Sequence, residues 1–239
     1  MSKSKKISSK QQEIILERYH GPLITDGVEL GYIKIVPWMN LLASIFWYFA
    51  AYYNDIIGVI QCFFGGCVLI SAFSIFFSFF NSVIEKYNIF TYLLLSLNFF
   101  ILLVWLDFIG IMMFIGGGDV YLRVYSITSR VFIIFLFILF LVMIFIVYPY
   151  FYRRDRRTNG AYREKESKFN SEDNKLFSSN FLLIFGLVVF VPPLLTGYIE
   201  NVFGLFSGIL FTLTIPALVV DAFYAALYAK QHPEEIDEL

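Results

Sequence analysis

VFIIFLFILFLVMIFIVY, residues 131–148, is the stretch of sequence that decides the fold. It consists of Phe, Ile, Leu, Val and Met up to Tyr148, so a helix made from it has no polar face to turn toward water. A run of about 18 apolar residues is long enough to cross the hydrocarbon core of a bilayer as a helix. The stretch therefore predicts a transmembrane helix, which Pro149 is expected to close.

The composition agrees with a chain whose main solvent is lipid. Hydrophobic residues make up 59% of the sequence and charged residues 15%, whereas soluble domains carry about 25% charged residues. The 29 Phe and 16 Tyr exceed what a soluble core of this length can hide, but lipid-facing helices and interfacial belts accommodate them. These features exclude an ordinary soluble protein.

Five more apolar stretches accompany the first, so the sequence predicts an all-α polytopic membrane protein with a bundle of about six transmembrane helices. The five stretches cover approximately residues 38–53, 56–80, 89–115, 179–196 and 203–228. The stretch at 89–115 is longer than the roughly 20 residues that a crossing needs. It is expected either to tilt or to end early, near Asp107.

The polar residues before the first span predict a small cytoplasmic cap. Ser9 and Gln12 resemble a capping box, which favours a short helix over residues 9–19. Asp26-Gly27 between the apolar runs 23–25 and 28–36 favours a β-hairpin, because both residues adopt positive φ at low cost. The predicted organisation is a cap at 1–34, four transmembrane helices at 35–152, a basic cytoplasmic loop at 153–178, two further helices at 179–229 and an acidic cytoplasmic tail at 230–239.

Lysine and arginine are distributed unevenly between the two predicted sides. With six spans, the N-terminus, the loop near Asn81, the loop after Arg153 and the C-terminus share one side and hold 16 of the 18 basic residues. The other side holds Arg123 and Arg130. The positive-inside rule therefore predicts cytoplasmic termini in a bacterial plasma membrane.

Two carboxylates fall inside predicted spans. Placing either carboxylate in its ionised form at the bilayer centre would cost at least about 2.5 to 3.5 kcal/mol. The two residues are Asp107 and Asp221. An interfacial position near a helix end is the favoured interpretation for each. The alternative is a functional role such as ion coupling.

Other polar and small residues in the spans are candidates for contacts between helices. Gln61, Asn98 and Asn40 are amides inside or beside the spans, of the kind that form interhelical hydrogen bonds, and substrate contact is the alternative. Gly65 and Gly66, and Gly204 and Gly208, allow close approach of another helix, within the chain or between chains.

Prolines interrupt the last two predicted spans. Pro192 and Pro193 lie near the exit of the fifth span, where a helix end is the favoured interpretation. Pro216 lies deeper in the sixth. Broken helices near the midplane are typical of transporter sites, because freed carbonyls can bind an ion or solute.

The remaining motifs indicate no catalysis. Both histidines lie outside the spans, and no grouping of acid, base and nucleophile or Gly-rich phosphate loop is present. We therefore expect no enzyme activity, catalytic residue, cofactor, metal or nucleic-acid partner. The basic cluster after the fourth span is expected to stop translocation and to contact anionic lipid headgroups. It consists of Arg153, Arg154, Arg156 and Arg157.

The layout of a small basic start and six spans is similar to that of many bacterial permease subunits and of small multi-span immunity proteins, although no motif is shared. It favours a non-enzymatic permease subunit or channel-like oligomer. The alternative is an immunity, defence or scaffolding protein that binds a toxin or partner through its cap and basic loop. The partners expected are the lipid bilayer, a further copy of the chain, or another membrane or cytoplasmic protein.

Overall fold

The computed structural model describes residues 27–53, 58–116, 124–157 and 198–231, and these residues form helices without any strand. The elements are η1 (Leu30–Lys34), α2 (Val36–Tyr53), α3 (Val59–Ser78), α4 (Asn81–Lys86), α5 (Asn88–Ile115), α7 (Ile127–Val142), η2 (Met143–Val147), α8 (Tyr148–Arg157), α11 (Ile199–Thr214) and α12 (Pro216–Gln231). The all-α part of the predicted fold is thus confirmed.

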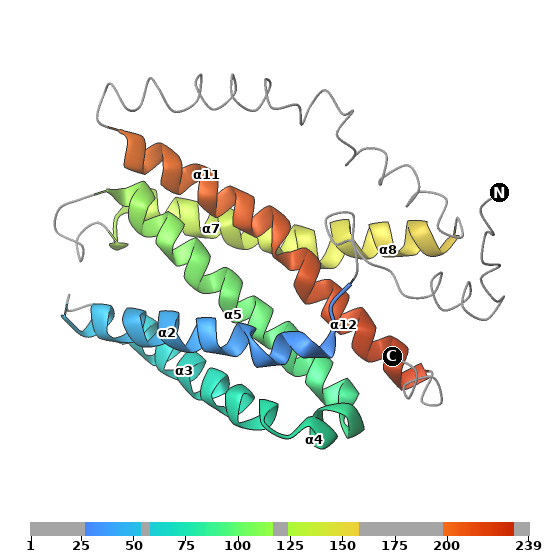
Figure 1. Cartoon of the computed structure of the whole chain (residues 1–239). Helices are drawn as coiled ribbons and strands as arrows, with labels where there is room; N and C mark the ends of the chain where they lie inside the picture. The colour runs from blue at the N-terminus through green and yellow to red at the C-terminus, as the bar shows by residue number, and fades with distance from the viewer. Residues whose placement is uncertain (1–26, 54–57, 117–123, 158–197, 232–239) are drawn as a thin grey trace, which may run out of the picture.

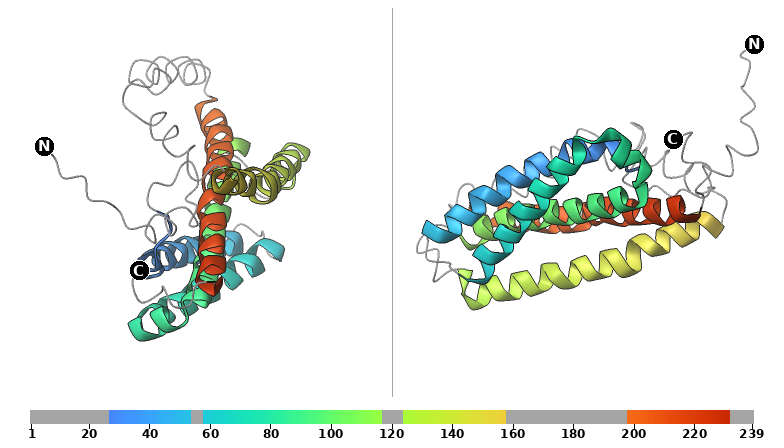
Figure 2. Two further views of the ribbon diagram at one scale, coloured as in Figure 1. Left: turned by 90° about the vertical axis from the view of Figure 1, so that its right-hand side faces the viewer. Right: turned by 90° about the horizontal axis from the view of Figure 1, so that it is seen from below.

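The long helices form three layers (Figure 1, Figure 2). α5 lies against α11 and α12 in the middle, α2 and α3 pack on one side, and α7 and α8 flank the other side. α2 and α5 run in the same direction, since Asn40 contacts Asn98 and Trp47 contacts Phe108. α3 follows α2 in the sequence and runs in the opposite direction, so the chain returns to the end of the bundle where α5 begins.

Five helical segments of the described chain are long and apolar enough to cross a membrane. They are Leu30–Tyr53, Val59–Ser78, Asn88–Ile115, Ile127–Arg154 and Ile199–Gln231. The predicted fifth span, residues 179–196, lies outside the described residues, as do residues 9–19 of the cap.

α5 settles the question of the overlong third span. Its 28 residues continue through Asp107 to Ile115 without a break. At 1.5 Å per residue the helix is about 42 Å long, whereas the hydrocarbon core is about 30 Å thick. The predicted early end near Asp107 is therefore wrong, and Figure 1 shows α5 running alongside α11 and α12 and inclined to α2 and α7.

The predicted β-hairpin would have its second strand at residues 28–36, and the structure has no strand there. Residues 30–34 form the 3₁₀ helix η1, in which the Tyr32 N–H donates to the Glu29 carbonyl and the Ile35 N–H to the Tyr32 carbonyl. The proposed first strand, 23–25, lies outside the described residues. Local turns satisfy this backbone without a partner strand, and Ile33 is fully buried against the bundle.

Pro149 does not end the fourth helix. α7, η2 and α8 form one continuous rod from Ile127 to Arg157. η2 is a π-helical turn in which the Tyr148 N–H donates to the Met143 carbonyl, five residues earlier. Such a turn rearranges the hydrogen bonds next to a proline, which is how membrane helices tolerate one. The arginine cluster consequently begins on helix α8 and not in a loop.

α12 packs closely on α5, and buried residues of the segment around η1 lie beside it. Alanines recur along α12 and are buried, and they let neighbouring side chains approach its backbone. They are Ala217, Ala222, Ala225, Ala226 and Ala229. Val28, Ile33, Leu95 and Phe99 fill the space beside them.

Candidate intramembrane polar site

An asparagine network joins the first three spans. The Asn40 Nδ2 of α2 donates to the Asn98 carbonyl at 2.8 Å and to its Oδ1 at 3.2 Å. Asn98 Nδ2 donates to Ser74 Oγ of α3 at 2.9 Å, and Trp105 Nε1 donates to Asn40 Oδ1 at 3.0 Å. Both amides are 0% exposed. Because every polar atom of the two side chains is used, the network fits the interhelical interpretation better than substrate contact.

Asp221 holds the segment that leads into α2. Its Oδ2 accepts the Val28 backbone N–H at 2.6 Å, and the side chain is 3% exposed. A backbone N–H donated to a carboxylate is a charge-assisted hydrogen bond, stronger than a neutral one. Asp221 therefore anchors the chain before η1 to α12.

Glycines mark the crossing of α5 and α11. A Cβ added at Gly204 would lie 2.3 Å from the Phe114 backbone N and 2.5 Å from the Gly110 carbonyl O. One added at Gly110 would lie 3.0 Å from the Gly208 N. The helices thus touch backbone to backbone within the chain, as small-residue interfaces allow.

Asp107 lies about one helical turn before Gly110 on α5, and it faces Thr212, which lies about one turn after Gly208 on α11. Thr212 Oγ1 donates to Asp107 Oδ2 at 2.9 Å. The second carboxyl oxygen, Oδ1, is buried and has no hydrogen-bond partner among the described residues. One carboxyl oxygen of Asp107 is therefore hydrogen-bonded, and the other is buried without a hydrogen bond from the described residues.

Pro216 breaks the long C-terminal helix about one turn after Thr212. Proline has no N–H to donate to the Thr212 carbonyl. Beyond it, the Leu218 N–H donates to the Ile215 carbonyl three residues back. Two side chains from neighbouring helices bind carbonyls beside the break: Tyr148 OH donates to Leu213 O at 2.5 Å, and Ser96 Oγ donates to Val219 O at 3.0 Å.

The break and the carboxylates lie in the middle parts of the long helices that carry them. Pro216 is one residue from the middle of the helical segment Ile199–Gln231. Asp107 is about 8 Å along the axis from the middle of α5, and the half-thickness of a hydrocarbon core is about 15 Å. A core centred on the helices would contain Asp107 and Asp221 on opposite sides of its midplane.

Several predicted residues lie apart from this site. Gln61 is half-buried in the first turn of α3. A Cβ at Gly65 would meet the Tyr48 ring at 3.5 Å, whereas one at Gly66 would meet nothing within 4 Å. Pro192 and Pro193 lie outside the described residues.

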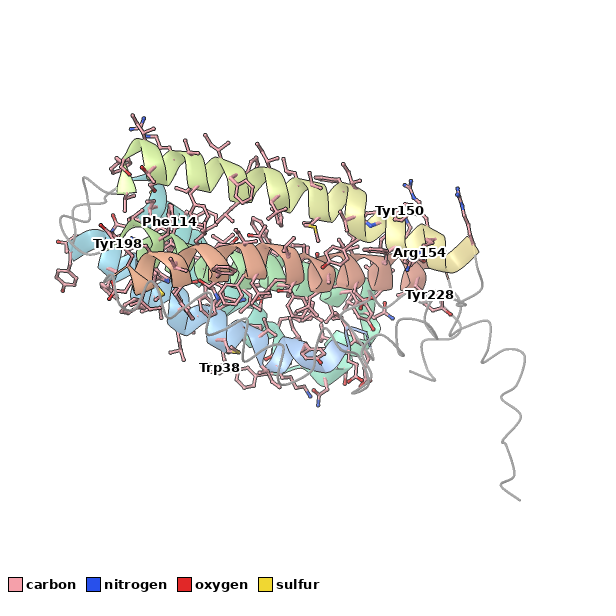
Figure 3. All side chains as sticks on the ribbon, turned by 90° about the horizontal axis from the view of Figure 1, so that it is seen from above. Trp38, Phe114, Tyr150, Arg154, Tyr198 and Tyr228 are labelled. Atoms are coloured by element: carbon pink, nitrogen blue, oxygen red, sulfur yellow. The ribbon has the colours of Figure 1, made fainter. Side chains whose placement is uncertain are left out.

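The arginine cluster lies at one end of the bundle. Arg153 and Arg157 are exposed, and the Arg154 guanidinium carbon lies 4.8 Å from the centre of the Phe151 ring. The side chain of Arg156 is outside the described part of the structure. Figure 3 shows Arg154 with Tyr150 and Tyr228 at this end, and Phe114 with Tyr198 at the other.

The sequence interpretation missed the partners of these residues. Gly110 is an isolated glycine inside a predicted span, a signal that often has a packing reason. Thr212 stands four residues before Pro216, where the proline leaves a carbonyl unpaired. Ser96 and Tyr148 carry no such signal, since ordinary serines and tyrosines occur throughout the chain.

Comparisons with protein-family models, with curated proteins and with solved structures gave no match for the chain.

Proposed function

We propose that this chain is a non-enzymatic, multi-pass protein of a bacterial plasma membrane that acts in permeation, as a small permease subunit or channel-like oligomer. The observation that carries the proposal is the open Asp107 carboxyl beside the helix break at Pro216. The five apolar helices supply the membrane setting.

The directions of the helices support an even number of crossings. α7–α8 and α11–α12 run parallel, because Phe132 lies near Gly208, Tyr148 binds Leu213 and Tyr152 stacks on Tyr224. Arg157 and Tyr198 consequently lie at opposite ends of the bundle (Figure 1). This arrangement supports the proposal that the chain crosses the membrane once more between Arg157 and Tyr198, at the apolar stretch of about 179–196, for a total of six crossings.

Charge supports cytoplasmic termini. Basic residues of the described chain gather at the end where α2 begins and where α3, α8 and α12 finish. They are Lys34, Lys86, Arg153, Arg154, Arg157 and Lys230. The opposite end has Arg130 among the described residues. The positive-inside rule assigns the first end to the cytoplasm, where the arginines of α8 contact anionic headgroups.

A broken helix beside a buried carboxyl is the arrangement expected of a permeation site. Half-helices near the midplane expose carbonyls that can replace part of the hydration shell of a passing ion or solute. Ionisable groups retained at this depth are costly, and they commonly mark ion pathways. The α5–α11–α12 contact is therefore the proposed path.

Flux measurements in proteoliposomes test this proposal. Three probes are followed separately: K⁺ by a fluorescent indicator, protons by an entrapped pH dye, and glycerol by osmotic swelling. We expect at least one to cross faster than in protein-free vesicles, and Asp107→Asn to reduce that flux several-fold. Glu200→Gln, an exposed carboxylate on α11, is the matched control. Equal fluxes with and without protein for all three probes would overturn the proposal.

The scaffold alternative has less support from the described residues. It assigns recognition to the cap at 1–34 and to the loop after Arg153, but Val28 and Ile33 of the cap are buried in the bundle core. Loss of partner capture on deletion of residues 1–26, with all three fluxes absent, would favour it.

A further inference from the structure

The two intramembrane carboxylates are held in different ways. Asp221 Oδ2 receives a backbone N–H from Val28, and its side chain has further contacts in the packed core. Asp107 receives one side-chain hydroxyl, from Thr212, and its Oδ1 has no partner in the described part of the chain. Asp221 is thus fixed as an anchor, and Asp107 has an oxygen available for a ligand.

A bare negative charge at Asp107 is expensive in this position. A carboxylate at intramembrane depth costs at least about 2.5 to 3.5 kcal/mol, and a single neutral hydroxyl offsets only part of that. The charge is removed most simply when Oδ1 takes up a proton, which leaves Oδ2 free to keep the Thr212 hydrogen bond.

The surrounding groups fit a proton better than a metal cation. Hard cations such as Ca²⁺ require about six to eight oxygen ligands. Asp107 and Thr212 supply one carboxyl and one hydroxyl, and no cluster of three or more His, Cys, Asp or Glu occurs among the described residues. A proton needs one oxygen.

Few other titratable groups face Asp107 from the helices packed on α5. On α11 the group in contact is Thr212, and Glu200 lies at the far start of that helix. α7 carries Arg130 in its first turn and α2 carries Tyr48. α12 carries Asp221, five residues after the break at Pro216. None of these is hydrogen-bonded to the Asp107 carboxyl, so no described cation neutralises its charge by direct contact.

We propose that Asp107 is a proton-binding site whose carboxyl takes up and releases one proton beside the helix break at Pro216. The step is balanced: a carboxylate and a proton become a carboxylic acid, and an O–H bond forms at Oδ1. This inference rests on the proposed permeation function for its biological purpose, and it identifies the proton as the permeating or coupling ion. Its test does not depend on flux.

Infrared difference spectroscopy of the full chain in lipid measures the protonated carboxyl directly. Spectra are recorded as the pH is changed above about 6, where exposed Asp and Glu, with ordinary pKa values of about 3.9 and 4.3, are ionised. We expect one carboxylic C=O band that titrates reversibly and is lost in Asp107→Asn. Thr212→Val, which removes the hydrogen bond to Oδ2, should keep the band and shift its frequency.

Asp221→Asn is the matched control and should retain the band. Absence of any titrating carboxylic band in the unmodified protein would overturn the inference, as would a band that survives Asp107→Asn or disappears in Asp221→Asn. If a flux is measured but no such band is found, the permeation proposal stands and the inference of a proton site at Asp107 is wrong. If the band is found but no flux is measured, the inference of a proton site stands and the permeation proposal is wrong.

Discussion

Gly204 lies where the backbones of α11 and α5 are closest. A methyl group there would lie 2.3 Å from the Phe114 N and 2.8 Å from the Met113 carbonyl carbon. These are backbone atoms that no side-chain rotation can move away. The residue therefore controls how α5 and α11 cross, and with it the distance between Asp107 and Thr212.

Gly204→Ala is expected to destabilise the protein by about 1–3 kcal/mol, because it overpacks a contact between backbones. The measurement is the midpoint of thermal unfolding in detergent. Gly66→Ala is the matched control: it also adds one methyl group to a helical glycine, but nothing lies within 4 Å of that position. It should leave stability unchanged or raise it by about 0.5–1 kcal/mol. Equal loss in both variants would contradict the crossing geometry.

At the residue scale the sequence identifies groups but not their partners. Asp107, Asp221, Asn98 and Gly204 can be found because polar or small residues are conspicuous in apolar spans. Their partners depend on how helices far apart in sequence cross, and Thr212 lies 105 positions from Asp107. Periodicity within one helix contains no information about that crossing.

At the scale of elements, the segment before α2 behaves as part of the bundle. Val28 and Ile33 are buried beside α12, and Asp221 binds the Val28 N–H at 2.6 Å. A buried N–H left without an acceptor costs about 1–3 kcal/mol. The attachment of η1 to α12 is therefore expected to depend on this carboxylate.

Asp221→Ala should release the segment without unfolding the helices. Ile33, which is 0% exposed, is replaced by cysteine in a background in which Cys62 and Cys67 are alanine. We expect Ile33→Cys to react slowly with a water-soluble maleimide, and the reaction to accelerate at least several-fold once Asp221→Ala is added. The exposed position Lys34→Cys serves as the control and should react at similar rates in both backgrounds. Unchanged protection of Ile33→Cys would show that Asp221 does not hold the segment.

Sequence patterns locate the transmembrane helices of the described chain more accurately than they locate where those helices begin and end. The described spans were located correctly, because long apolar runs have few alternatives in lipid. Residues 28–36 resembled a strand, yet local 3₁₀ hydrogen bonds and Asp221 satisfy their backbone. Pro149 resembled a helix end, yet the π-helical turn before it lets the helix continue. Both errors arise where a tertiary or non-standard hydrogen bond replaces the expected one.

For the whole molecule, the surface has the character of a lipid-facing one. α7 and η2 attach to the bundle by a narrow buried stripe, namely Ser129, Phe132, Leu136 and Met143. The rest of this rod exposes large apolar side chains, with Phe145 72% exposed. In water such a surface would drive aggregation, whereas in a bilayer it contacts acyl chains. The middle layer of α5, α11 and α12 is shielded on two sides, which suits a path across the membrane.

The central claim is that the bundle crosses the membrane with its basic end in the cytoplasm and that the chain crosses once more between Arg157 and Tyr198. Both residues are exposed, so each can be replaced by cysteine in the background without Cys62 and Cys67. Intact bacterial cells are treated with a membrane-impermeant maleimide, before and after permeabilisation. Glu85→Cys and Ile127→Cys, at opposite ends of the bundle, report the two sides.

Tyr198→Cys and Ile127→Cys are predicted to label in intact cells, and Arg157→Cys and Glu85→Cys only after permeabilisation. Labelling of Arg157→Cys and Tyr198→Cys from the same side would contradict the account, because the parallel α7–α8 and α11–α12 helices could then not both span the bilayer.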